Sequence, residues 1–523
     1  MTDTGSHGIQ RRRLFFGICL ALVPTGASFG LVSNILGQLK QEFILTNYEV
    51  GLIGGAALWG MAISLMVLGP LLEGYGLKNA ARLAFAGHLT GLTLMIAAVT
   101  QVGEPSAFWI LMIGAATLAM GNGMIEVSGN PLAAALYPEE KTKRLNWFHA
   151  FFPIGIIAGG LAGFVMVEWG GPLGYWPYQL AIIYLPILIY GAMVLPLAFP
   201  KTENASAGIP VGEMFRYTLT SPLFFLLLAT MAMTVSIELG PMRWVPNVLG
   251  SVGMHGILVL VWISGWMVVL RLLAGHFVER LAPTGMLLLA SVLTGIGLLL
   301  LSDVQGLWSA LAVATIFAWG IAFFFPTMVG LVSERLPRTG SLGIVLVCGV
   351  GLGTAGAVGV PALGRIADAQ LARALDPPRT MALLERAARD LPAYVADAER
   401  DADAAALGYP PGDVHEAIAF TQAALDGYRE TGQIAGDATA NALRAIIATA
   451  VPNEPLVADA AEMLGPAEAY GGQVSFRYTA PLALVLVAIF GTLYWRDRRQ
   501  GGYRAVRLDR VTESAPAARV AGG

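Results

Sequence analysis

Among the few ionisable residues inside long apolar stretches of the chain, three stand out: Glu126, Glu238 and Arg271. If those stretches cross a membrane, each charged side chain costs about 2.5–3.5 kcal/mol even on a lenient insertion scale. Residues of this kind bind substrates, carry protons or pair with one another inside a membrane protein. These three side chains are therefore the first candidates for chemistry.

Glu126 stands in the run Gly121-Asn-Gly-Met-Ile-Glu-Val-Ser-Gly-Asn-Pro131. Asn130 follows one helical turn later on the same face, and Pro131 frees a backbone carbonyl nearby. A desolvated carboxyl group here could take and release a proton as a cavity opened to each side in turn. The alternative is a structural Glu that is hydrogen-bonded across helices.

Glu238 is the only acidic residue of its apolar stretch, with Arg243 and Trp244 shortly after it. It either binds substrate or proton directly, or forms a structural pair with Arg243. Arg271 comes near the end of the next apolar stretch, where a long side chain can reach the interface, and we expect it to act mainly as a latch. Trp244 is available as an aromatic wall for an amphipathic ligand.

The composition indicates that lipid is the main solvent of the chain. Of 523 residues, 56% are hydrophobic and 13% charged, with a mean hydropathy of +0.65, which is too apolar for a soluble protein of this length. The net charge of −3 does not favour a nucleic-acid partner. The scattered His and Cys residues predict no metal site, and we expect no cofactor. We find no arrangement of residues typical of an enzyme.

A membrane-spanning helix needs about 20 mostly apolar residues, and this rule predicts an all-α membrane protein with twelve spans. They are expected near 14–36, 50–72, 80–101, 108–136, 147–168, 179–199, 222–248, 256–278, 284–302, 307–332, 340–363 and 477–495. The predicted domains are a six-helix bundle (1–200), a cytoplasmic linker (201–221), spans 7–11 (222–366), a helical insert (367–475), span 12 (476–500) and a tail (501–523).

Positive charge alternates between the predicted loops. Arg11–Arg13, Lys141 and Arg496 mark loops that carry Lys or Arg, whereas the loops at 101–107 and 170–178 carry neither. Because basic loops stay on the cytoplasmic side, both termini are predicted to be cytoplasmic in an inner (plasma) membrane, and the insert extracytoplasmic. The first apolar run is too long for a signal peptide.

Two predicted loops share a pattern. Gly69 precedes Glu73 by four positions after the second span, and Gly275 precedes Glu279, which is followed by Arg280, after the eighth. Glycine permits close helix approach, and the carboxylate can cap or pair with a neighbouring helix. We therefore expect Glu73, Glu279 and Arg280, with Arg271, to gate the cytoplasmic side. The pair resembles the loop motif of the major facilitator superfamily in degenerate form, which implies two halves that rock about a central site.

Glycines at intervals of four, at positions 155, 159 and 163, indicate close helix packing.

The Glu126 run, followed by Tyr137-Pro138 and by Arg144-Leu-Asn146-Trp-Phe-His149, resembles the fucose permease family of sugar:proton symporters. The resemblance implies that Glu126 is the proton-linked sugar ligand, that Asn130 is a polar contact and that His149 faces the sugar. Asn146 belongs to the same motif. The family's first-span Asp aligns with Ser33, beside Asn34. The two loop patterns are about 206 residues apart, and this offset places Glu238 within about one residue of the seventh-span counterpart of Ser33. We therefore hypothesise that Glu238 replaces the missing acid.

We therefore expect a monomeric secondary active transporter that takes up a monosaccharide or similar polyol with protons by alternating access. Two alternatives remain open: efflux of an apolar or organic-anion solute, and a non-transporting membrane sensor of the same fold.

Overall fold

The computed structural model describes residues 4–43, 47–102, 104, 106–206, 208–250, 256–398, 411–449 and 455–506. Within these ranges every regular element is a helix. Ten helical segments are long and apolar enough to cross a membrane; one of them, Leu52–Gln101, contains two successive spans, and Ile257–Leu272 is a shorter apolar helix. The described chain thus has the expected twelve-span, all-α layout.

The amino-terminal half holds six spans. They are formed by α1 (Thr4–Leu20) with α2 (Leu22–Glu42), α3 (Asn47–Ile63) with a π-helical turn (Ser64–Leu68) and a 3-10 turn (Gly69–Leu71), α4 (Leu72–Ala97) with a 3-10 turn (Ala98–Gln101), α5 (Ser106–Leu136), α6 (Lys141–Trp169), and α7 (Trp176–Ala181) with α8 (Tyr184–Val194), which follow a 3-10 turn (Gly171–Gly174).

The carboxy-terminal half follows two short connecting helices, α9 (Glu203–Ser206) and α10 (Val211–Thr220). Its spans are α11 (Pro222–Gly250), α12 (Gly256–Leu272), α13 (Ala274–Leu301), α14 (Leu307–Ile321) with α15 (Phe324–Arg335), α16 (Gly340–Thr354) with a π-helical turn (Ala355–Gly359) and α17 (Val360–Ala374), and the last part of α22 (Pro455–Arg499); a 3-10 turn (Pro337–Thr339) precedes α16.

Two loops at equivalent places in the halves share a backbone turn. Inside α4, Gly76 has a φ of 79°, and inside α13, Ala282 has a φ of 58° just before Pro283. The two residues are 206 positions apart, which is the offset between Glu73 and Glu279. Glycine adopts this conformation readily, whereas Ala282 is the one non-glycine residue with positive φ in the described chain. The internal repeat is therefore visible in the backbone as well as in the sequence.

Helices of the insert region form a hydrophobic core of their own. The group comprises α18 (Pro377–Ala398), α20 (Pro411–Thr431), α21 (Gly436–Ala448), the end of α17 and the start of α22. Leu384 and Leu443 are fully buried in it, and Arg386 pairs with Asp459 over 2.5 Å. Both α17 and α22 continue without a break into spans, so the transmembrane helices extend beyond the expected limits of 363 and 477.

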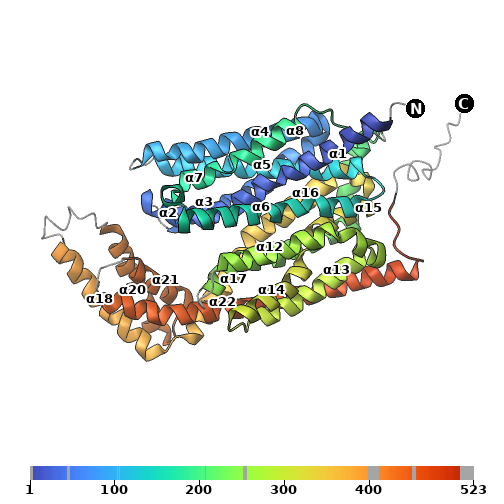
Figure 1. Ribbon diagram of the computed structural model, residues 1–523. Coiled ribbons are helices and arrows are strands. Elements are labelled where there is room, and N and C mark those ends of the chain that lie inside the picture. Colours follow the sequence, from blue (N-terminus) through green and yellow to red (C-terminus); the bar gives the residue numbers. More distant parts are fainter. Residues whose placement is uncertain are drawn as a thin grey trace, which may run out of the picture.

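The two halves lie side by side, with the amino-terminal helices in blue to teal and the carboxy-terminal helices in green to red (Figure 1). The start of α1 and the end of α22 lie at one end of the bundle, and α18, α20 and α21 lie at the other (Figure 1). The two ends are called the terminal end and the insert end below. The side chain of Ser33 and residues 507–523 of the predicted tail fall outside the described residues.

Candidate functional site

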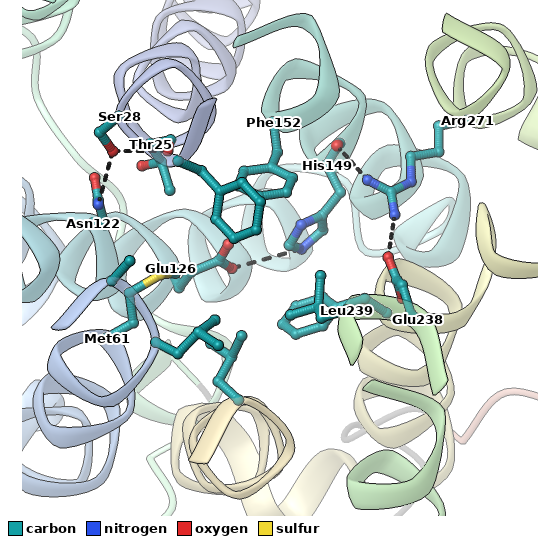
Figure 2. Close-up of a pocket in the computed structure, with 15 residues that line it drawn as sticks. Thr25, Ser28, Met61, Asn122, Glu126, His149, Phe152, Glu238, Leu239 and Arg271 are labelled. Atoms are coloured by element: carbon teal, nitrogen blue, oxygen red, sulfur yellow. Dashed lines mark hydrogen bonds and ion pairs between the residues drawn. The ribbon is translucent and has the colours of Figure 1, made fainter. Parts of the chain in front are cut away.

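A cavity lies where the two halves face each other (Figure 2). Its polar lining comes from both halves, with Glu126 and His149 from one and Glu238 and Arg271 from the other. Its volume is about 50 Å³, which is room for a few water molecules. A solute as large as a sugar therefore requires the halves to separate or the side chains to move.

Glu126 projects from α5 into this cavity and is 4% exposed. Asn130, one turn later, donates from Nδ2 to Glu126 Oε2 over 2.6 Å and to the Glu126 carbonyl over 3.1 Å. Since Nδ2 is the donor, Asn130 Oδ1 must accept the hydrogen bond from His149 Nε2 at 2.8 Å. The arrangement fixes the Nε2-protonated form of His149, 3.7 Å from Glu126 Oε2.

Arg271 occupies a different place from the one expected. Instead of reaching the interface, its side chain is 2% exposed and forms an ion pair with Glu238, from Nη2 to Oε1 at 3.1 Å (Figure 2). Arg271 also donates from Nε to the carbonyl of Ala322 and from Nη1 to that of His149. These hydrogen bonds and the ion pair hold the guanidinium inside the protein, so the side chain does not extend to the surface. Arg271 thus lies in the site, and it links the two halves through His149.

Glu238 likewise has a different partner from the predicted Arg243. The Arg243 guanidinium lies 3.7 Å from the centre of the Phe29 ring, across the boundary between the halves. Glu238 is 3% exposed, and its second oxygen, Oε2, is buried without a hydrogen bond in the described part of the chain. A buried acceptor of this kind is costly unless a proton or a ligand meets it.

A second series of hydrogen-bonded polar side chains, which the sequence did not indicate, reaches the same cavity. Asn122, one turn before Glu126, donates to Ser28 Oγ over 3.2 Å and lies 3.0 Å from His88 Nε2. His88 Nδ1 lies 2.9 Å from Tyr190 Oη. Asn122 and Ser28 line the cavity with Thr25 (Figure 2). The four-residue spacing of Asn122, Glu126 and Asn130 was the available signal, since it places all three on one face of α5.

Four residues predicted to bind substrate or proton do not line the cavity: Asn130, which contacts it only through Glu126 and His149, and three residues that lie elsewhere. Asn34 donates to Gln179 Oε1 over 3.0 Å near the insert end of α2. Asn146 is fully buried and donates to the Thr142 carbonyl and to Thr327. Trp244 lies against Gly364. The aromatic walls come instead from Phe29, Phe152 and Phe325.

At the terminal end, Glu73 accepts hydrogen bonds from Thr202 of the linker and from Ser341 of α16, both at 2.7 Å. It thus connects the amino-terminal half to the carboxy-terminal half. Glu279 and Arg280 line a separate cavity between the halves, of about 600 Å³. Glu73 thus takes part in a contact between the halves, whereas Glu279 and Arg280 line a cavity between them.

A contact that the sequence did not indicate closes the same end. Glu334 Oε1 accepts from the Thr142 backbone N–H at 3.1 Å and from its hydroxyl at 2.7 Å, across the boundary between the halves. Glu334 Oε2 accepts from Tyr503 Oη at 2.7 Å. The Val506 N–H donates to the Glu334 carbonyl. One carboxylate thus joins both halves and the start of the tail.

No group of three or more His, Cys, Asp or Glu residues in the described part of the chain could hold a metal ion.

Comparison with known proteins is consistent with this arrangement. A family model described as Major Facilitator Superfamily matches residues 18–370. The L-fucose-proton symporter of Escherichia coli (strain K12) is 31% identical over 133 residues, 25% of this chain and 29% of the relative. The cis,cis-muconate transport protein of Acinetobacter baylyi is 28% identical over 187 residues, 35% of this chain and 42% of the relative.

These two alignments span less than half of either curated relative. Among solved structures, the proton:xylose symporter XylE bound to 6-bromo-6-deoxy-D-glucose superposes with a TM-score of 0.57 at 13% identity, over 68% of this chain and 88% of that one. At this identity the likeness concerns the fold. The family match covers well over half of the sequence, and the chain therefore belongs to the major facilitator superfamily, a family of multi-pass membrane transporters rather than enzymes.

Proposed function

We propose that this transporter takes up a monosaccharide or similar polyol together with protons, and that Glu126 carries the proton. The supporting observation is the position of Glu126: a carboxyl group 4% exposed, in a cavity shared by both halves, held by Asn130 at 2.6 Å. Repeat-built transporters bind substrate at such a central place and expose it to each side in turn.

Charge balance in the cavity supports a coupled proton. Arg271 and Glu238 already form an ion pair, so an ionised Glu126 leaves the site with one net negative charge. Moving an uncompensated charge through a closed, poorly hydrated state is costly. A proton on Glu126 removes that charge, and transport of a neutral solute then carries one proton with it.

The lining suits a sugar. Phe29, Phe152 and Phe325 offer flat apolar faces, against which the C–H face of a pyranose packs, whereas amide, hydroxyl and carboxyl groups meet its hydroxyls. Asn122, Ser28 and Glu126 provide these polar groups on the same cavity. The names of the fucose and xylose symporters among the similar proteins point the same way.

The proposed orientation places the terminal end in the cytoplasm of a bacterial-type inner membrane, with the insert outside. Alternating Lys and Arg in the loops support it. Closure of the terminal end by Glu73 and Glu334 would then be closure of the cytoplasmic gate. The transporter would work as a monomer.

Proteoliposomes containing an internal pH dye test the proposal. With a panel of sugars, wild-type protein should move protons in a sugar-dependent way. Glu126→Gln, which keeps the shape but cannot ionise, should abolish proton movement and still exchange labelled sugar. Glu168→Gln, at the exposed end of α6, is the matched control and should behave as wild type. Sugar transport without proton movement in the wild-type protein would refute proton coupling. Loss of coupling in Glu168→Gln would refute the assignment of the coupled proton to Glu126.

An organic anion is the second candidate substrate, because Arg271 lines the cavity and one relative is named for muconate transport. The same liposomes distinguish the two classes when a dicarboxylate replaces the sugar. Uptake of the dicarboxylate alone would overturn the sugar proposal. Ligand binding without any transport would indicate a sensor.

A further inference from the structure

A further cavity, larger than the central one, lies at the terminal end beside α1 and α6. It has a volume of about 670 Å³, and its walls include residues of both halves. We call it the arginine groove. It is lined by Arg11, Arg12, Phe15, Phe16, Cys19, Tyr137, Arg144, Trp147, Phe151 and Leu272. It shares no lining residue with the central cavity.

The polar part of the groove lining is positively charged. The Arg11 and Arg144 guanidinium groups lie 3.9 Å and 4.2 Å from the centre of the Tyr137 ring. Arg144 also pairs with Glu140 over 2.9 Å. Arg11 and Arg12 are exposed and form no ion pair with a carboxylate in the described chain. At least two cationic side chains are therefore available to an anion.

The rest of the groove lining is apolar and partly exposed. Phe16 is 53% exposed and packs edge-on against Phe151 at 5.6 Å. Leu272 at the end of α12 is 38% exposed. An arginine cluster next to aromatic and aliphatic side chains, at a helix end of a membrane protein, combines the two features that an anionic lipid needs. A small anion would use only the charged half of this lining.

We propose that the arginine groove binds an anionic phospholipid of the surrounding leaflet, with its phosphate at Arg11 and Arg12 and an acyl chain along Phe16 and Phe151. The positive charge of these arginines favours an anionic over a zwitterionic headgroup. Guanidinium groups suit phosphate because their planar N–H donors match its oxygens.

The bound lipid would contact both halves. The Trp147 indole N–H donates to the Leu272 carbonyl over 2.9 Å, and this hydrogen bond joins α6 to α12 at the groove. Both residues line the groove. A lipid seated there therefore bridges the halves on the side where Glu73 and Glu334 also join them, and it stabilises the state closed at the terminal end.

Native mass spectrometry of the full chain tests the binding directly. Protein is equilibrated with mixed micelles of phosphatidylglycerol and phosphatidylcholine, and the retained lipid is counted. Wild type should retain phosphatidylglycerol in preference to phosphatidylcholine, and Arg11→Gln with Arg12→Gln should lower that retention several-fold. The charge-matched control is Arg13→Gln with Lys201→Gln, two exposed residues outside the groove, which should retain as much as wild type.

Equal retention by the two double variants would overturn the proposal, as would equal retention of the two lipids by wild type. Displacement of phosphatidylglycerol by inorganic phosphate alone would show a free-anion site with no need for the acyl chain, and would overturn it too. Phe16→Ser, which leaves the arginines in place, should also lower lipid retention. The readout is lipid mass, so the outcome does not depend on which solute is transported.

Discussion

Arg271 and Glu238 form an ion pair at 3.1 Å, and both side chains are at least 96% removed from solvent. The same guanidinium donates to the carbonyls of His149 and Ala322. Arg271 thereby fixes a carboxylate of its own half and a backbone group of the other half at once. The pair is a structural element of the site as well as a source of charge.

Breaking this pair on one side should destabilise the protein more than removing it entirely. Arg271→Met leaves Glu238 as an uncompensated buried charge, at a cost of about 3–5 kcal/mol, whereas replacing both partners by apolar residues is often close to neutral. Thermal unfolding in detergent should therefore rank wild type, then Arg271→Met with Glu238→Met, then Arg271→Met alone. A double variant less stable than the single one would contradict the assigned pairing.

The fold could be predicted from the sequence because long apolar helices are nearly the sole way to satisfy the backbone in lipid. Twelve segments, the loop pattern at Glu73 and Glu279 and the family resemblance were all local signals. The sequence did not indicate that the helices of the last two spans continue, as parts of α17 and α22, into the insert region. The apolar sequence ends at the predicted span limits, whereas the helical hydrogen bonds continue past them.

The site was only partly predictable, for a different reason. Spacing along one helix places Glu126 and Asn130 together, but it cannot show which arginine meets Glu238. Arg243 is five residues from Glu238 on the same helix, yet Arg271 of α12 is the partner. The sequence does not indicate Asn122 and Glu334, because their roles come from contacts with residues of other helices. An amide or a carboxylate at a helix end has no distinctive pattern along its own helix.

His149 should matter through its donated hydrogen bond to Asn130. His149→Gln preserves an N–H donor of similar reach, whereas His149→Phe leaves Asn130 Oδ1 buried and unpaired. A lost buried hydrogen bond costs about 1–3 kcal/mol, so uptake by His149→Phe should fall roughly 5- to 150-fold. The His149 carbonyl that holds Arg271 is present in both variants. Equal uptake by the two variants would show that the donor is not needed.

Tyr503 should help to hold the terminal end closed. Tyr503→Phe removes the donor to Glu334 Oε2 and keeps the ring over which Arg335 lies at 4.3 Å. A net hydrogen bond contributes about 0.5–1.5 kcal/mol, so the population open at the terminal end should rise by roughly 2- to 12-fold. Spin labels at the exposed positions 139 and 276 report this opening as a longer distance. Thr492→Val, on the exposed face of α22, should leave the distance distribution unchanged.

The same contact should persist at alkaline pH. Burial, followed by the nearby Glu334 carboxylate, raises the pKa of Tyr503 well above its usual value of 10.0. A raised pKa means that the contribution of the neutral phenol is complete below pH 10.0 and is lost only as the pH passes the higher value in the folded protein. The spin-label distances should therefore stay constant from neutral pH to about pH 10, and a widening near neutral pH would count against this contact.

Close packing of α2 against α6 depends on glycine. A Cβ atom built at Gly155 would lie 2.3 Å from the Val23 carbonyl oxygen and 2.8 Å from the Ala27 nitrogen, both backbone atoms that cannot yield. At Gly265, in α12, a Cβ would meet nothing within 4 Å. Gly155→Ala should therefore lower stability by about 1–3 kcal/mol, the usual cost of overpacking, whereas Gly265→Ala should be neutral or slightly stabilising because alanine favours the helix. Paired melting curves of the two variants test this, since they differ by the same methyl group in the same kind of helix. If both variants melt at the same temperature, α2 and α6 pack less closely than the glycine spacing indicates.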